Sequence, residues 1–266
     1  MHEPMPIPQA EDILHDPAGW AFFLDIDGTL LEMAPTPDAV VVPADLPALL
    51  RGLEKTFGGA VALSTGRQVG DADRLLAPLQ LTTCGVHGTE ARTVPGGEIL
   101  MLVPQVPSEL VDAVIDAARE VPGILVEQKA VGLAVHYRHN PEARPLLLKE
   151  LARILLKFED FALYPGRRVF EVIPKGYSKG TALTWVMRLP PFKGRRPIMI
   201  GDDAGDQPAF AAAEKHGGFG LKVAGEHFSD GEADFRNAAD VRSWLAKLTH
   251  LPASAERDDT RQLGPQ

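Results

Sequence analysis

Four short apolar segments recur along the chain, and each ends abruptly at polar or glycine-rich residues. They lie at 20–24, 60–63, 81–86 and 197–200. Short, almost continuous apolar segments are typical of strands that are buried on both faces of a parallel sheet. The pattern therefore predicts a parallel sheet that carries polar groups at the carboxyl ends of its strands.

Amphipathic segments predict helices between some of these strands. One follows Asp45, carries leucines at 46, 49, 50 and 53 and ends at Gly58-Gly59, and another follows Ser178 and ends before Pro190. Alternating strands and helices are typical of a doubly wound, Rossmann-like α/β core with right-handed crossovers. Ligands of such sheets bind beyond the carboxyl ends of the strands, so we expect the polar clusters to share one cleft.

The segment 103–174 departs from this alternation. It predicts helices at 108–121 and 141–158, and each is followed by a hairpin, at 124–137 and at 161–173. We interpret the segment as an α+β cap domain, inserted between a first core segment at 1–102 and a second at 175–250. We expect residues 251–266 to form a mobile tail.

Composition and charge exclude several classes of protein. The 266 residues include 27 Lys and Arg against 36 Asp and Glu, a formal net charge of −9, so neither nucleic acid nor an anionic membrane surface is an expected partner. No apolar segment approaches the ~20 residues of a membrane helix, and the first residues lack the apolar stretch of a signal peptide. The single cysteine, Cys84, excludes an internal disulfide and is expected in the core. We expect a cytoplasmic globular protein, and nothing in the sequence identifies a protein partner.

The first polar cluster, Asp25-Ile26-Asp27-Gly28-Thr29, directly follows the first predicted strand. A carboxylate such as Asp25 can attack phosphorus to form an acyl phosphate. Asp27 projects to the same side of an extended backbone, where it can protonate the leaving oxygen and later deprotonate water. The alternative hypothesis is an ordinary strand-end turn, because Asp and Gly are common turn residues.

The last polar cluster contains three carboxylates, those of Asp202, Asp203 and Asp206. They repel one another unless a cation holds them, and hard oxygen ligands favour Mg²⁺. The alternative is a solvated acidic loop. Between the two clusters, Thr65 can donate a hydrogen bond to a phosphate oxygen, and Lys179, just after the helix cap at Ser178, supplies a positive charge.

The order of these motifs resembles that of a known superfamily. DIDGT, STGR, YSKG and GDDAGD resemble the four motifs of the haloacid dehalogenase superfamily. Within it, the sequence is similar to the trehalose-6-phosphate phosphatases through VHGTE at 86–90, VEQK at 126–129, HYR at 136–138, GRRVFEV at 166–172 and SKGTA at 178–182. The resemblance covers most of the chain, from residue 21 to about residue 210. It implies a Mg²⁺-dependent phosphatase that hydrolyses a phosphorylated disaccharide, trehalose 6-phosphate, through an aspartyl-phosphate intermediate.

The resemblance also implies individual roles. It implies that Asp25 is the nucleophile, that Asp27 is the acid and base, and that Thr65 and Lys179 bind the phosphoryl oxygens. The implied Mg²⁺ ligands are the Asp25 carboxylate, the Asp27 carbonyl and Asp202, with Asp203 or Asp206 as further ligands. The implied sugar-binding residues are Glu127, Lys129 and Glu171 on the cap and Arg67, His87 and Glu90 on the core.

The fourth motif departs from the family pattern. Where the family has Thr-Asp-Glu, this chain has Gly205-Asp206-Gln207, which lacks one hydroxyl and one charge. We expect a modified metal affinity rather than a lost one.

Three other functions remain open at this point: a phosphatase of another sugar phosphate such as sucrose phosphate or a glycosyl phosphoglycerate, a phosphomutase, and a non-catalytic sugar-phosphate sensor. Glu127 with Lys129 can also be an ion pair on an exposed strand, and His136 and Arg138 can be the polar face of a hairpin.

Overall fold

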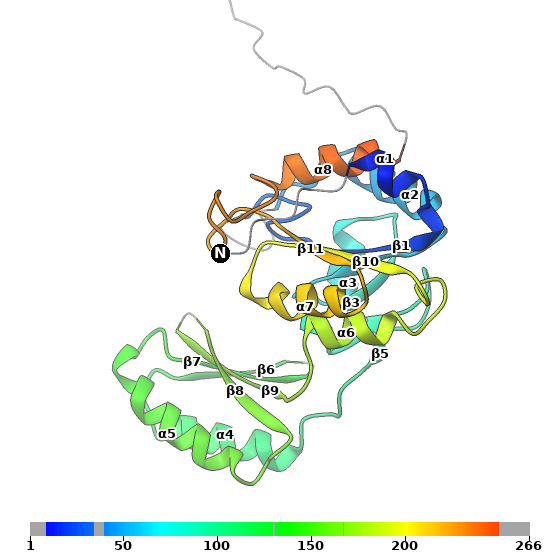
Figure 1. Cartoon of the computed structure of the whole chain (residues 1–266). Coiled ribbons are helices and arrows are strands. Elements are labelled where there is room, and N and C mark those ends of the chain that lie inside the picture. The colour runs from blue at the N-terminus through cyan, green and yellow to red at the C-terminus, as the bar shows by residue number, and fades with distance from the viewer. Residues whose placement is uncertain (1–8, 35–39, 130, 167, 250–266) are drawn as a thin grey trace, which may run out of the picture. The chain divides into compact units, whose positions relative to one another are not determined.

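The structure is a computed structural model, and it describes residues 9–34, 40–129, 131–166 and 168–249. The expected tail at 251–266 lies outside these residues. The chain divides into two compact units (Figure 1). The first unit combines the residues up to Ile99 with those from Lys179 onward, and the second unit is Leu100–Ser178. The sequence predicts an insertion over 103–174, and the use of the second unit as a cap stays a prediction.

The first unit contains a predominantly parallel sheet with the strand order β11-β10-β1-β2-β3-β4. Strand β4 pairs antiparallel with β3, whereas β11, β10, β1, β2 and β3 run parallel. The strands are β1 (Trp20–Leu24), β2 (Val61–Ser64), β3 (Thr82–Gly85), β4 (Glu90–Arg92), β10 (Arg196–Gly201) and β11 (Phe219–Lys222). The prediction of a doubly wound α/β core is confirmed, and β1, β2, β3 and β10 are the four apolar segments of the sequence.

Strand β4 is not predicted from the sequence, because two of its three buried residues, Glu90 and Arg92, are charged. Arg92 is almost fully buried and forms an ion pair with Asp73, in which Arg92 Nη2 lies 2.7 Å from Asp73 Oδ1. The guanidinium also donates to the carbonyl oxygen of Leu81. A strand that buries a paired charge carries no apolar pattern, so the period of its sequence does not reveal it.

Helices cover both faces of this sheet (Figure 1), with α1, α2 and α8 on one face and α6 and α7 on the other. The helices of the first unit are α1 (Ala10–Leu14), α2 (Leu46–Thr56), α3 (Val69–Leu75), α6 (Lys179–Val186), α7 (Gln207–Lys215) and α8 (Ala238–Lys247), with 3₁₀ turns η1 (Pro17–Gly19), η3 (Val86–Gly88) and η5 (Ala204–Asp206). Phe22 of β1 packs with Phe57 and Trp244, and the next residue, Phe23, packs on Phe192. Both faces of β1 are therefore buried, which explains its unbroken apolar sequence.

The second unit is a four-stranded antiparallel sheet with the order β6-β7-β9-β8 and two helices against one face (Figure 1). Its elements are β5 (Leu100–Met101), α4 (Ser108–Arg119), β6 (Leu125–Lys129), β7 (Gly132–His136), η4 (Pro141–Ala143), α5 (Arg144–Leu155), β8 (Phe161–Gly166) and β9 (Val169–Pro174). The second unit has a hydrophobic core of its own, in which Leu110 and Leu147 of the helices pack with Val135 and Val172 of the strands. Among the described residues, no helix is long and apolar enough to cross a membrane.

Candidate active site

The residues that follow β1 and β10 meet at the carboxyl edge of the parallel sheet. Leu24 is in register with Ile200, and the Asp25 amide donates to the Ile200 carbonyl at 3.0 Å. Because the two strands are adjacent and parallel, Asp25 and Asp202 leave the sheet at the same place. One carboxylate oxygen each of Asp25, Asp202 and Asp206 lies within 4.8 Å of the others. The structure thus brings together two motifs that are far apart in the sequence.

Lys179, the first residue of α6, neutralises part of this carboxylate cluster. Its Nζ lies 2.8 Å from Asp25 Oδ1 and 2.7 Å from Asp206 Oδ1, and its side chain is buried. Burial by itself lowers the pKa of a lysine, but the Asp25 and Asp206 carboxylates outweigh it and raise the Lys179 pKa above its usual value. Lys179 therefore stays charged at neutral pH and fixes the position of the Asp25 carboxylate.

Asp206 uses both of its oxygens within the protein. Oδ1 accepts from Lys179, and Oδ2 accepts from the backbone amides of Asp202 and Asp203, each at 3.1 Å. The side chain is completely buried. Asp206 thus shapes the turn that follows β10 and holds Lys179 in place.

Asp202 and Asp203 differ in their surroundings. Asp202 Oδ1 accepts a hydrogen bond of 3.1 Å from Thr29 Oγ1, which joins it to the turn after β1. Asp203 is exposed, and its side chain caps η5. The sequence assigns no role to Thr29, although it lies in the first motif, four residues from Asp25. Its contact to Asp202 makes it a positioning residue for that carboxylate.

Burial raises the carboxyl pKa values in this cluster. The Asp25 pKa is raised to about 7 by burial, against the opposing effect of Lys179, and the Asp206 pKa is raised to about 7 by burial and by the Asp25 charge. Burial and the charges of Asp206 and Asp203 raise the Asp202 pKa to about 6. The carboxylates outnumber the lysine that contacts them, so the cluster favours a cation in addition to Lys179.

Asp27 contacts a residue of the second motif. Arg67 donates through Nε to Asp27 Oδ2 and through Nη2 to Asp27 Oδ1, each at 2.6 Å. This two-point contact joins the turn after β1 to the residues that follow β2. The sequence predicts a sugar contact for Arg67, and this pairing with Asp27 is an interaction that the motifs alone do not reveal.

The residues after β2 and β3 form the neighbouring part of the same edge. Thr65 is buried, its amide donates to the Cys84 carbonyl at 2.9 Å, and its carbonyl accepts from the His87 amide at 3.1 Å. Cys84 is buried in β3, as predicted. His87 has a φ of 54° and follows Val86, whose φ is 46°, so two residues that are not glycine adopt left-handed conformations at this edge.

Glu90 contributes to the structure of the same edge. It is buried, and its Oε1 accepts from the Val69 amide at 2.5 Å, at the start of α3. A carboxylate at the first turn of a helix satisfies a backbone donor that has no partner within the helix. The sugar contact that the sequence predicts for Glu90 stays a prediction.

Gly28 is required by the geometry of the turn after Asp27. Its φ is +83°, and a Cβ at this position would lie 2.1 Å from Asp202 Oδ2.

Replacing Gly28 by Ala displaces the Asp202 carboxylate, and we expect metal affinity to fall about 10- to 100-fold. Titration with Mg²⁺, followed by calorimetry or thermal shift, measures this change. Gly194 has the same φ of +83° and nothing within 4 Å of a Cβ, so Gly194→Ala separates backbone strain from the collision. Equal metal affinities in the two variants would contradict the role assigned to Gly28.

The remaining predicted residues lie in the second unit. Glu127 is in register with Ala134, and Ala134 is in register with Glu171, so the three residues share one face of the sheet. Lys129 Nζ lies 2.9 Å from Glu171 Oε1, and His136 Nε2 lies 3.0 Å from Glu127 Oε2. The sequence offers His136 as part of the polar face of a hairpin, and the structure places it on the same face as Glu127. Its alternation with the buried Val135 is the signal that places it on this face.

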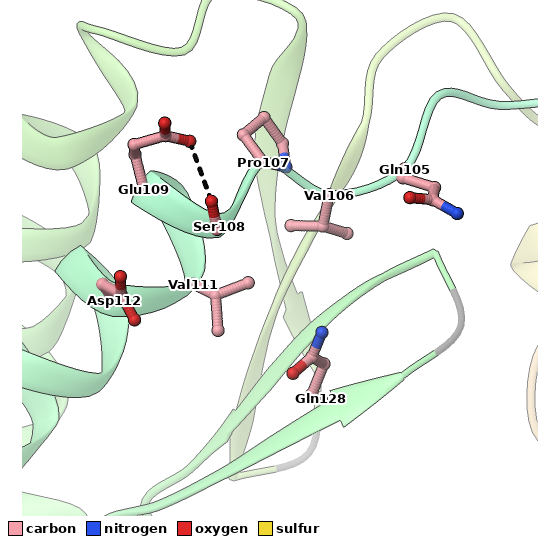
Figure 2. Close-up of a pocket in the computed structure, with 8 residues that line it drawn as sticks. All are labelled: Gln105, Val106, Pro107, Ser108, Glu109, Val111, Asp112 and Gln128. Carbon is pink, nitrogen blue, oxygen red and sulfur yellow. Dashed lines mark hydrogen bonds between the residues drawn. The ribbon is translucent and has the colours of Figure 1, made fainter.

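A pocket of about 490 Å³ lies on the other face, beside the start of α4 (Figure 2). Gln128 is among its lining residues and points toward α4, which shows that the neighbouring Glu127 and Lys129 project to the opposite face. None of the site residues predicted from the sequence is among the eight lining residues, which are Gln105, Val106, Pro107, Ser108, Glu109, Val111, Asp112 and Gln128.

Comparisons with known proteins identify the family of the chain. The sequence matches the family model of trehalose-phosphatase over residues 23–243. It is 41% identical over 207 residues to a Sinorhizobium fredii protein called "probable trehalose-phosphate phosphatase", with 77% of each chain covered. It is 34% identical over 233 residues to the trehalose-6-phosphate phosphatase of Escherichia coli, with 87% of each chain covered.

Solved structures share the fold. A trehalose-6-phosphate phosphatase of Aspergillus fumigatus superposes with a TM-score of 0.71 at 22% identity, over 92% of this chain and 99% of that chain. BT1666 of Bacteroides thetaiotaomicron, a phosphatase of the haloalkanoate (HAD) superfamily, superposes with a TM-score of 0.63 at 16% identity, over 92% of this chain and 97% of that chain.

The chain has the fold of a phosphatase of the haloalkanoate (HAD) superfamily, and its carboxyl edge carries Lys179 and a group of three carboxylates that can hold a metal ion. The family match and the relatives extend over most of the chain. The chain belongs to the trehalose-phosphatase family.

Proposed function

We propose that this protein hydrolyses trehalose 6-phosphate to trehalose and phosphate, with Mg²⁺ as the metal ion. The observation that carries the proposal is the buried Lys179 between Asp25 and Asp206, with Asp202 within 4.8 Å of both carboxylates. A non-catalytic sensor does not need a carboxylate held by a buried lysine beside a second acid. The named activities of the Escherichia coli and Sinorhizobium fredii relatives supply the substrate.

We propose that Asp25 is the nucleophile. One Asp25 oxygen attacks phosphorus, the bond from phosphorus to the sugar oxygen breaks, and the sugar oxygen takes a proton from Asp27. Asp27 then accepts a proton from water, which attacks phosphorus and releases phosphate, and the Asp25 carboxylate is restored. Lys179 and the Thr65 hydroxyl stabilise the phosphoryl oxygens.

Both Asp27 oxygens accept hydrogen bonds from Arg67, so Asp27 can reach the leaving sugar oxygen only after this contact opens. We propose that a sugar hydroxyl replaces Asp27 as the partner of Arg67 when substrate binds. This exchange links the acid role of Asp27 to the presence of the sugar.

The residues present fit a magnesium ion. Carboxylate oxygens are the ligands that Mg²⁺ prefers, and the Asp25 and Asp202 oxygens are close enough to share one ion. We propose these two side chains and the Asp27 carbonyl as ligands. Asp206 acts as a positioning residue because both of its oxygens already accept hydrogen bonds, and Asp203 is exposed at the rim. When bound, the ion neutralises charge on the transferring phosphoryl group.

The sugar is proposed to bind to Glu127, Lys129 and Glu171 of the second unit, which thereby serves as the cap, and to Arg67, His87 and Glu90 of the first. Paired carboxylates and an ammonium match the hydroxyl groups of a disaccharide, each of which can donate and accept. A sugar with a misplaced hydroxyl leaves one of these charged groups without a partner, which lowers its affinity.

A panel of phosphate esters tests the proposed substrate. Phosphate release is measured side by side for trehalose 6-phosphate, sucrose phosphate, a glycosyl phosphoglycerate and an aryl phosphate. The expected result is the highest kcat/KM for trehalose 6-phosphate. A preference for another sugar phosphate would contradict the substrate, and an isomerised sugar phosphate without net phosphate release would identify a phosphomutase.

Magnesium is expected to stabilise the protein more at high pH than at low pH. Asp25 and Asp202 have pKa values raised to about 7 and about 6, so protons compete with the ion for these carboxylates as the pH falls through this range. We expect a rise in Tm of about 3–6 °C on adding Mg²⁺ at about pH 8 and a much smaller rise at about pH 5.5. The Asp202→Asn variant is the control and should lose most of the rise at both pH values. An equal rise at both pH values in the wild type would contradict the ligand assignment.

A further inference from the structure

The face of the second unit's sheet that lies away from α4 and α5 carries an unbroken row of residues across all four strands. Glu127 of β6 is opposite Ala134 of β7, Ala134 is opposite Glu171 of β9, and Glu171 is opposite Tyr164 of β8. Side chains that are directly opposite on neighbouring strands lie about 5 Å apart and share a face. We call this face, with Lys129 and His136, the open face.

Small residues form the centre of the open face. Lys129 on β6 contacts Glu171 on β9 at 2.9 Å, although β7 lies between the two strands. The β7 positions beneath this ion pair are Gly132, which is in register with Lys129, and Ala134. A Cβ at Gly132 would lie 2.5 Å from the Val172 carbonyl oxygen and 2.7 Å from Ile173 Cγ2, so no larger side chain fits there. The centre of the open face is therefore recessed, and charged side chains lie on both sides of it.

Tyr164 ends this row with an aromatic side chain. It is 43% exposed, on the edge strand β8, and directly opposite Glu171. Phe161 and Leu163 of the same strand face the core of the unit, so alternation leaves Tyr164 on the open face. Its exposed ring is not needed by the packing of the second unit, and the proposed chemistry does not use it.

A sugar ring has two kinds of surface. Its hydroxyl groups lie around the edge, and its C–H bonds form an apolar face that packs against the negative face of an aromatic ring. Binding sites combine such apolar contact with a few well-placed polar groups. The open face offers both next to each other, with Glu171 and Lys129 for hydroxyls and the Tyr164 ring for C–H bonds.

We propose that Tyr164 is a further substrate-binding residue, which packs its ring against a pyranose ring whose hydroxyls bind Glu171 and Lys129. The inference rests on the proposed function, because it assumes that the open face binds a sugar. It adds an affinity contact that acts on the sugar and takes no part in phosphoryl transfer.

Substitution of Tyr164 tests this inference through steady-state kinetics. For Tyr164→Ala, the KM for trehalose 6-phosphate is expected to rise about tenfold while kcat changes less than about twofold. A contact that is equally strong in the ground state and in the transition state affects substrate binding alone. The ratio of kcat/KM for trehalose 6-phosphate to that for an aryl phosphate should fall accordingly. Tyr164→Phe keeps the ring and should restore most of the KM. Leu156, at 77% exposure on the same unit, is the matched control, and Leu156→Ala should leave both constants unchanged.

An unchanged KM in Tyr164→Ala would overturn the inference, as would a Tyr164→Phe variant as impaired as Tyr164→Ala, because the hydroxyl would then be the contact. Failure of the Tyr164 inference can be distinguished from failure of the proposed function. If the proposed function fails, the wild type shows no preference for trehalose 6-phosphate in the panel. If only the Tyr164 inference fails, the wild type shows that preference and Tyr164→Ala keeps it.

Discussion

Replacing Asp25 by Asn is expected to reduce phosphate release from trehalose 6-phosphate by about 10⁴-fold or more. An amide cannot form the acyl phosphate, and neither Asp27 nor Asp202 can take over this role. Asp27 is the proposed acid and base of the reaction, and Asp202 accepts a hydrogen bond from Thr29. The measurement is phosphate release at saturating substrate and Mg²⁺, with enzyme purified without contaminating phosphatase.

The fold should survive this substitution. Asp25 is buried and its pKa is raised to about 7, so removing its charge removes a desolvation cost, and Lys179 keeps Asp206 as a partner. Thermal unfolding checks that the variant is folded. Asp116→Asn, at an exposed position of α4, is the matched control with the same chemical change and should keep full activity. Residual activity above about 1% in Asp25→Asn would contradict Asp25 as the nucleophile.

Replacing Lys179 by Met is expected to affect both activity and stability. Activity should fall about 10³-fold, because the phosphoryl oxygens lose a fixed positive charge and Asp25 loses its anchor. The free energy of unfolding without metal should fall by about 3 kcal/mol at about pH 8, because two buried carboxylates lose their shared partner. Denaturant unfolding measures the second effect.

The loss of stability should shrink as the pH falls. Beside Lys179 the pKa values of Asp25 and Asp206 are about 7, and Lys179 lowers both, so without Lys179 the folded state takes up protons at pH 7 or above as the pH falls. The repulsion left by Lys179→Met then disappears, and at about pH 5.5 we expect most of the stability to return. Lys175→Met, at an exposed position four residues earlier, is the control and should change neither quantity. The same destabilisation at both pH values would contradict the proposed electrostatics.

Much of the fold can be predicted from the sequence, because a strand buried on both faces leaves an apolar segment with sharp ends. The position of Asp25, Asp202 and Lys179 at one edge follows from the same logic. Parallel strands present their carboxyl ends together, so residues that directly follow such strands become neighbours. Strand β4 could not be predicted in this way, because its buried Arg92 is paired with Asp73.

The partners of individual side chains could not be predicted. Asp206 is a carboxylate in an acidic motif, and only the structure shows that both of its oxygens are used by Lys179 and two backbone amides. The contact between Asp27 and Arg67 likewise depends on how two loops meet. In the second unit, the pairing of His136 with Glu127 depends on the register of β6 and β7, which the sequence does not specify.

The most direct test of the central claim is chemical trapping of the phosphorylated residue. Enzyme in excess over trehalose 6-phosphate is quenched within the first turnover and treated with borohydride, which reduces an acyl phosphate to an alcohol and leaves a free carboxylate intact. Peptide mass spectrometry should find homoserine at position 25. Aspartate alone at position 25, in samples that have released phosphate, would contradict the account.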